Sequence, residues 1–159
     1  MSPGNSAGSD TDARALYARI LDTWNKRDAR NYALCFSTDA NLVGFDGSQV
    51  DGQQQIGAHV SEIFSHHQTG RYVSIVRETR EIAPGVVLLR GVAGLVPADK
   101  EDINPDLNAV QTLIAVRNGA ELKGALFQNT PAKFDMRPEL ATKLTEELRA
   151  VLKAEKKPG

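Results

Sequence analysis

The chain has 159 residues, of which 41% are hydrophobic, enough for one domain with a substantial core. Its 19 basic and 20 acidic residues nearly balance, which gives no electrostatic reason to expect binding to nucleic acid or to an anionic membrane. No apolar run approaches the roughly 20 residues of a membrane-spanning helix, and the N-terminal stretch lacks a signal-peptide pattern, so we expect a cytoplasmic protein. The single cysteine, Cys35, excludes an internal disulfide and a multi-cysteine metal site.

Three helices are predicted in the first half of the chain. The first runs over about residues 11–27, and Asp28 can cap a shorter second helix. The third spans about 53–67. Each of the two longer helices carries one apolar stripe at helical spacing. The stripes are Leu16, Tyr17, Ile20, Leu21 and Trp24, and then Ile56, His59, Val60, Ile63, Phe64 and His67.

The second half of the chain predicts strands. A short strand over 41–45 is followed, after the third helix, by four strands in a meander. They cover 72–82, 86–96, 107–116 and 122–130. The run 86–96 is apolar without clean alternation, so we expect both faces of the sheet to be covered, one by helices and the other by a second copy of the chain. An amphipathic helix follows Pro131.

Helices followed by strands favour an α+β fold, with the helices packed on a curved antiparallel sheet to form a cone that leaves a pocket. We expect a disordered leader over 1–10, the folded domain over 11–134, and a C-terminal amphipathic helix and tail over 135–159. A homodimer is expected through the convex face of the sheet. That face is predicted to present Val87, Leu89, Ala93, Val110, Thr112, Ile114 and Val116.

Four segments carry a resemblance to a known family: 24–28 (WNKRD), 36–40 (FSTDA), Gly52 to Ile56, and 125–130 (ALFQNT). They resemble the nuclear transport factor 2-like superfamily, and within it the SnoaL-like, SgcJ/EcaC-type branch, over roughly residues 12–134. The resemblance implies the cone-shaped fold. The SgcJ-type members accompany enediyne polyketide pathways, so it also implies a polyketide-derived ligand.

The superfamily includes ketosteroid isomerase, whose acid–base residues can be compared by position. The three positions fall on Ile20, near Gly44 and near Leu113, none of which can transfer a proton. The isomerase mechanism is therefore not implied, although Asp46 lies close to the base position.

Three side chains are candidates for chemistry. His59 and His67 share the inward stripe of the third helix, and an imidazole can act as general acid or base near neutral pH. Arg90 interrupts an apolar strand and would hold a developing oxyanion if it faced the pocket. The alternatives are a buried structural histidine, a histidine at a helix end, and an Arg90 ion pair with a carboxylate such as Asp46 or Glu78.

Further residues are predicted to contact a ligand. Gln111 and Asn129 are neutral amides in apolar strands; if they face inward they could orient polar ligand atoms, and if they face outward they could form dimer contacts. The family resemblance favours inward positions for Asn129 and Phe127. Asp46 could join them at the pocket. Ordinary core packing is the alternative for the apolar wall. That wall would comprise Trp24, Tyr32, Phe45, Ile63 and Phe127. We expect no metal site and no cofactor, because the two histidines are too far apart for one ion and phosphate-binding loops are absent.

Two functions remain open from the sequence. One is a cofactor-independent enzyme acting on a polyketide or polyene intermediate by proton-transfer cyclisation, isomerisation or dehydration in enediyne antibiotic biosynthesis. The other is a non-catalytic binding or chaperone module that shields a reactive apolar intermediate. A homodimeric scaffold for a partner enzyme is a third reading.

Overall fold

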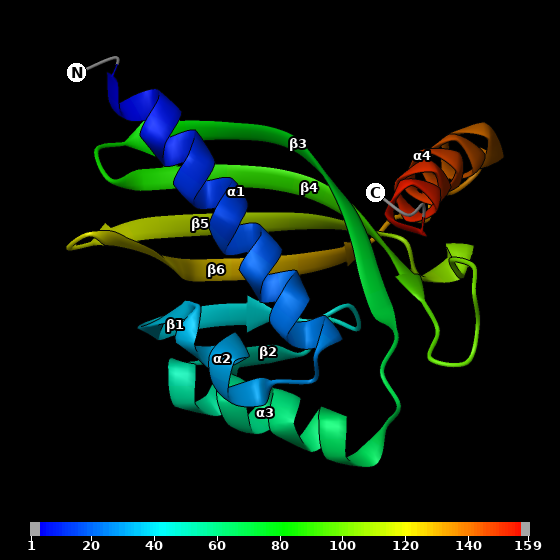
Figure 1. Cartoon of the computed structure of the whole chain (residues 1–159), viewed down its shortest axis with the longest axis horizontal. Helices are drawn as coiled ribbons and strands as arrows, with labels where there is room; N and C mark the ends of the chain where they lie inside the picture. Colours follow the sequence, from blue (N-terminus) through cyan, green and yellow to red (C-terminus); the bar gives the residue numbers. More distant parts are fainter. Residues whose placement is uncertain (1–3, 157–159) are drawn as a thin grey trace.

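The computed structural model describes residues 4–156 of the chain, as four α-helices, one short 3₁₀ helix and six strands (Figure 1). The helices are α1 (Gly4–Asn25), α2 (Ala29–Leu34), α3 (Gln53–His66), η1 (Pro105–Leu107) and α4 (Pro138–Lys156). The strands are β1 (Phe36–Val43), β2 (Gln49–Asp51), β3 (Arg71–Ala83), β4 (Val86–Val96), β5 (Ala109–Asn118) and β6 (Glu121–Pro131). The fold is α+β, as predicted.

All six strands form one curved sheet in the order β2-β1-β6-β5-β4-β3. The predicted four-strand meander is confirmed as β3 to β6, which pair antiparallel throughout. The prediction of a wholly antiparallel sheet was wrong at one place, because β1 runs parallel to β6. β1 begins at Phe36, whose pairing partner on β6 is Gly124. Asp28 does cap that helix, accepting a hydrogen bond from the backbone N–H of Asn31.

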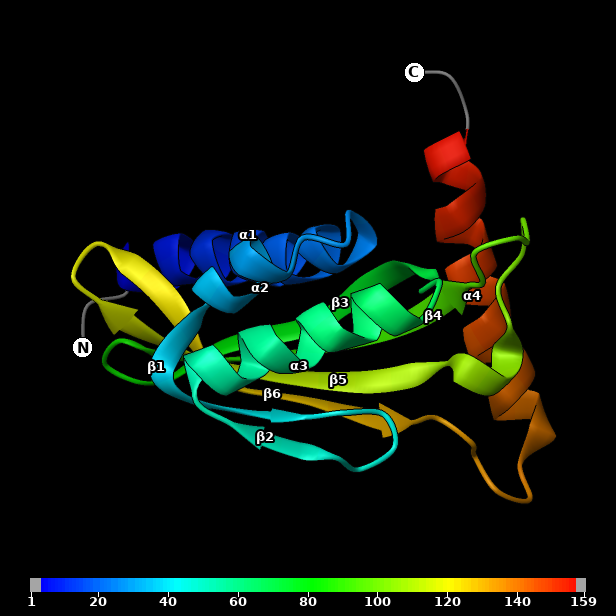
Figure 2. The same cartoon turned by 90° about the horizontal axis from the view of Figure 1, so that it is seen from below.

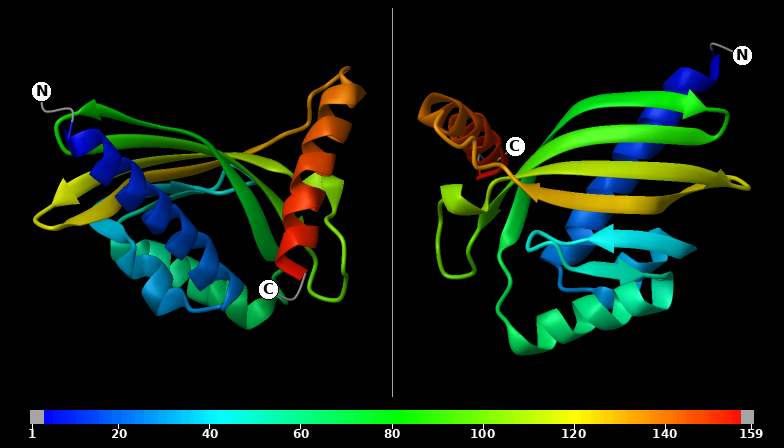
Figure 3. Two further views of the ribbon diagram at one scale, coloured as in Figure 1. Left: turned by 45° about the horizontal axis from the view of Figure 1, so that its top comes forward. Right: turned by 180° about the vertical axis from the view of Figure 1, so that it is seen from behind.

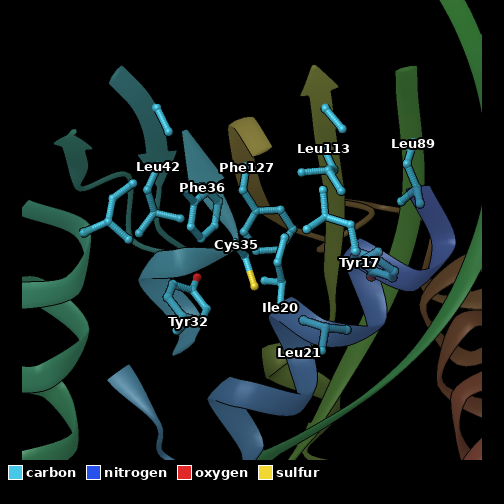
Figure 4. Packing of buried hydrophobic residues seen from close by; sticks show 14 of the residues in the cluster. Tyr17, Ile20, Leu21, Tyr32, Cys35, Phe36, Leu42, Leu89, Leu113 and Phe127 are labelled. Atoms are coloured by element: carbon cyan, nitrogen blue, oxygen red, sulfur yellow. The ribbon is translucent and has the colours of Figure 1, made fainter. Parts of the chain in front are cut away.

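The concave face of the sheet is covered by α1, which crosses it diagonally, and by α2 and α3 beside the β1–β2 edge (Figures 1 and 2). The apolar stripe of α1 packs on inward residues of the central strands. Figure 4 shows Tyr17 and Ile20 of α1 against Leu89 and Leu113. Leu89 and Leu113 are both 0% exposed, so this layer is the main core of the molecule.

The convex face is partly covered by α4 rather than wholly by a partner. Leu144, Leu148 and Leu152 of α4 pack against Val92 and other outward residues near one end of the sheet. In Figure 3 this helix lies at that end only, and the rest of the face is uncovered by any helix. The two-sided apolar character of β4 therefore arises from α1 on one side and α4 on the other.

The predicted membership of the convex face was wrong for Val87, Leu89 and Ala93. These residues are buried on the concave side, where α1 fixes the phase of β4. The β5 residues of that prediction do face outward: they alternate with the buried Gln111 and Leu113 and are only half-buried or exposed. They are Val110, Thr112, Ile114 and Val116.

Both ends of the chain differ from expectation in detail. α1 begins at Gly4, well before the predicted start at Thr11, so residues 4–10 of the predicted disordered leader belong to a helix. Residues 1–3 of that leader lie outside the described residues, as do residues 157–159 of the predicted tail. α4 begins at Pro138, where proline suits the first helical turn.

Candidate functional site

A cavity of about 400 Å³ lies between the helices and the concave face of the sheet. Every layer of the cone contributes to its wall, which is mostly apolar, as is typical of small-molecule sites. The lining residues are Leu21, Trp24, Tyr32, Leu42, Gly44, Phe45, Asp46, Ser48, His59, Val60, Ile63, Tyr72, Leu95, Leu107, Phe127 and Asn129. The predicted hollow between helices and sheet is therefore present.

The five residues predicted as the apolar wall all line this cavity. Trp24 is at the last turn of α1, Tyr32 is in α2 and Ile63 is in α3. Phe45 follows β1, and Phe127 points inward from β6 beside Leu113 of β5. Trp24 stands at the centre of an aromatic cluster, with ring centroids 5.1, 5.7 and 6.2 Å from those of Phe64, Tyr72 and Tyr32. These distances lie in the range in which aromatic pairs attract one another.

His59 and Asp46 provide the ionisable groups of the wall. His59 is half-buried on α3, and Asp46 is in the turn between β1 and β2. The backbone N–H of Ser48 donates to the Asp46 carboxylate at 2.9 Å, which lowers the pKa of that carboxyl, and the charge of His59 lowers it further. Asp46 is therefore an anion at neutral pH, on the same cavity wall as His59.

Two tyrosines bring hydroxyl groups to the wall. Burial raises the pKa of Tyr72 to about 12 and raises that of Tyr32 as well, so both stay neutral at physiological pH. Tyr32 is only 3% exposed, and its hydroxyl makes no hydrogen bond to any residue in the range 4–156. Sequence reasoning missed Tyr72. Its only sequence signal was an aromatic ring at the start of a strand, which does not identify the face.

The predicted inward position of Arg90 was wrong. The Arg90 side chain is 56% exposed and pairs with Glu78 at 3.1 Å on the convex face, which is the structural ion pair kept as the alternative. Gly91, not Arg90, faces α1, because a Cβ at Gly91 would lie 2.9 Å from the Tyr17 hydroxyl. Arg90 therefore cannot hold an oxyanion in the cavity.

His67 does not reach the cavity either. It is the residue that ends α3, its backbone is extended, and its side chain is exposed. Because α3 has ended, the His67 side chain no longer follows the helical spacing of the stripe. The inward direction predicted for His67 was therefore wrong. Of the two histidines on the predicted stripe, only His59 lines the cavity.

Gln111 does not line the cavity itself but contacts Asn129, which does. It is 0% exposed, accepts a hydrogen bond from the Tyr17 hydroxyl at 2.5 Å, and donates to Asn129 at 2.6 Å. Asn129 itself is half-buried and lines the cavity. Cys35 is buried, and burial raises the pKa of its thiol, as expected of an unreactive cysteine.

Within residues 4–156, no three histidine, cysteine, aspartate or glutamate side chains gather as metal ligands. Over the same range, none of the helices has the length and hydropathy needed to cross a membrane.

No protein-family model and no curated protein matches the sequence. Solved structures do match the fold. A domain of unknown function with a cystatin-like fold from Nostoc punctiforme has a TM-score of 0.75 at 18% identity, covering 92% of this chain and 98% of that one. An NTF-2-like protein of unknown function from Shewanella oneidensis has a TM-score of 0.64 at 14% identity, covering 76% of this chain and 98% of that one.

A third similar structure is Aln2 from a Streptomyces species, with a TM-score of 0.65 at 15% identity, covering 91% of this chain and 98% of that one. Identities this low establish architecture and not activity. The chain has the NTF2-like, cystatin-like fold: helices on a six-stranded curved sheet, with an added C-terminal helix.

Proposed function

We propose that the protein binds an apolar, oxygen-bearing small molecule of the polyketide type in the cone cavity and catalyses a proton transfer on it without a cofactor. The observation that carries the proposal is that His59 and Asp46 both line the wall of a mostly apolar cavity. His59 is the proton-transfer group, and the Asp46 carboxylate supplies a negative charge on the same wall.

The ligand class rests on two supports of different kinds. The aromatic and aliphatic wall favours a ring-containing apolar molecule. The resemblance of the sequence to SgcJ/EcaC-type proteins favours a polyketide intermediate of enediyne antibiotic biosynthesis. Cyclisation, isomerisation and dehydration all begin with a proton removed or added beside an oxygenated carbon, which one imidazole can do.

A non-catalytic binding module is the second candidate. It is favoured by the outward positions of Arg90 and His67, which leave the cavity with a single acid–base pair and no cationic group for an oxyanion. In this alternative the cavity holds a reactive intermediate away from water.

2-Tetralone, a bicyclic ketone with exchangeable α-protons, separates the two candidates. Binding is followed through the fluorescence of Trp24, which is the only tryptophan of the chain and lines the cavity. Catalysis is followed by NMR as deuterium incorporation in D₂O. We expect binding and accelerated exchange, with His59→Gln reducing the acceleration by roughly 10²- to 10⁴-fold. Binding without acceleration would support the holding module, and no binding would overturn both.

We also propose a homodimer through the part of the convex face that α4 leaves uncovered. Leu88, Ile114 and Leu126 lie opposite one another on β4, β5 and β6 and are each only half-buried. Val116, in the same face, is 37% exposed. A continuous apolar row of this kind is typical of a contact between proteins.

A further inference from the structure

Two hydrogen bonds link Tyr17 of α1, Gln111 of β5 and Asn129 of β6, and Asn129 lines the cavity. The Tyr17 hydroxyl donates to the Gln111 side-chain oxygen, and the Gln111 side-chain nitrogen donates to the Asn129 side-chain oxygen at 2.6 Å. Gln111 and Asn129 are directly opposite each other on β5 and β6. The first two members are 1% and 0% exposed, so they are shut off from solvent.

The order of the chain fixes which end of each amide points where. A carboxamide has one acceptor end and one donor end, so an acceptor bond at one end of Gln111 leaves its NH₂ group to donate at the other. The Asn129 oxygen is then occupied by Gln111, and the Asn129 NH₂ group is the end left for the cavity. Among the described residues, the hydrogen bond that involves the Asn129 side chain is the one its oxygen accepts from Gln111.

Gly91 makes this arrangement possible. It is opposite Gln111 in the pairing of β4 with β5, and a side chain there would collide with the Tyr17 hydroxyl. Glycine within a strand commonly marks such a close approach. Burial also raises the pKa of Tyr17, so its hydroxyl keeps the proton that it donates.

We infer that Asn129 presents a fixed hydrogen-bond donor to the ligand, and that the cavity therefore selects a neutral carbonyl group at this position. The inference rests on the proposed binding function and specifies the ligand of the same site. A carbonyl oxygen accepts from NH₂, whereas a hydrocarbon leaves the donor without a partner. A carboxylate is disfavoured because Asp46 is itself an anion and the described wall residues include no lysine or arginine. Tyr17 and Gln111 are positioning residues, since neither lines the cavity.

The test compares two probes of the same shape, 2-acetylnaphthalene and 2-isopropenylnaphthalene, which differ in a carbonyl oxygen replaced by a methylene group. Their dissociation constants are measured by quenching of Trp24 fluorescence. We expect the wild-type protein to prefer the ketone by roughly fivefold to tenfold, the effect of one hydrogen bond. Asn129→Leu should abolish the preference while leaving hydrocarbon binding within about twofold.

Tyr17→Phe tests the positioning role, because it removes the donor that orients Gln111 without touching the cavity wall. We expect it to reduce the preference for the ketone and to leave hydrocarbon binding unchanged. Asn129→Asp is a second variant, in case Asn129→Leu does not fold. It replaces the donor by an acceptor, so the ketone should become the weaker ligand. Equal wild-type affinity for both probes overturns the inference while leaving ligand binding intact. If neither probe binds, the proposed function fails with it.

Discussion

His59 of α3 and Asp46 of the β1–β2 turn lie together on the cavity wall, although different elements carry them. The pKa of the Asp46 carboxyl is lowered first by the backbone N–H of Ser48 and additionally by the charge of His59. The turn thus places an anion on the same wall as the imidazole.

Replacement of Asp46 by asparagine tests this pairing. Asp46→Asn removes the anionic group from the cavity wall and leaves a side chain of the same size. In the 2-tetralone exchange assay we expect this variant to lower the exchange rate, with a smaller loss than for His59→Gln. Ser61→Asn, on the exposed side of the same helix, is the control. An unchanged exchange rate would show that Asp46 does not contribute to the proton transfer.

Substitution of Gly91 tests the packing of α1 on the sheet. A Cβ at this position would lie 2.9 Å from the Tyr17 hydroxyl and 3.1 Å from the Ile75 carbonyl oxygen. We expect Gly91→Ala to lower the free energy of unfolding by about 1–3 kcal/mol, measured by urea denaturation. Combining it with Tyr17→Phe should reduce that cost, because the nearest colliding atom is removed.

Gly8→Ala is the matched control for this substitution. Gly8 is an exposed residue of α1, and a Cβ there would meet no atom within 4 Å. Because alanine is the better helix former, this change should raise the free energy of unfolding by roughly 0.5–1 kcal/mol. Equal effects of the two substitutions would mean that the space around Gly91 is not as tight as the structure requires.

The sequence was sufficient for the fold and for most of the cavity wall because these follow from local patterns. The α1 stripe, the α3 stripe and the turns between β3 and β6 each determine their element without help from distant residues. Trp24 and Ile63 could therefore be assigned to the inner layer from their helical stripes, whereas the inward direction of Phe127 was implied by the family resemblance.

Arg90 could not be placed in the same way. β4 is apolar on both faces, so alternation does not identify the inward face. Two long-range contacts decide which residues of β4 face inward. Tyr17 of α1 packs over Gly91 on the concave face, and Leu148 of α4 packs beside Gly94 on the convex face. The C-terminal helix was predicted, but the sequence did not decide whether it docks on its own sheet or on a partner subunit, and so it could not identify the outward face of β4.

Alkaline pH should destabilise the protein through its buried tyrosines. Burial raises the pKa of Tyr72 to about 12 and raises the pKa values of Tyr17 and Tyr32, whereas an unfolded tyrosine titrates near pH 10. Below about pH 10 both states keep these protons, so the stabilisation is complete. Above that pH the unfolded state releases protons that the folded state retains, and the free energy of unfolding falls as the pH rises.

The magnitude is up to about 1.4 kcal/mol per pH unit for each fully buried tyrosine. Urea denaturation between pH 9 and pH 11.5 measures the slope. Tyr32→Phe should make it shallower, since the phenylalanine has no proton to lose, while the stability below pH 9 should change little because the Tyr32 hydroxyl has no protein partner. A slope identical to that of the wild-type protein would contradict the buried, neutral state of Tyr32.

The proposed dimer contact is tested at the centre of the uncovered apolar row. Ile114 lies between Leu88 and Leu126 across three strands, so Ile114→Lys places a charge in the middle of the contact. We expect sedimentation velocity to show a dimer for the wild-type protein and a folded monomer for this variant, because an unpaired buried charge is costly at an interface. Ser61→Lys on the exposed side of α3 adds the same charge elsewhere and should leave the dimer intact. A wild-type protein that sediments as a monomer at all concentrations would exclude this face as a stable contact, and α4 would then be the only partner that the convex face has.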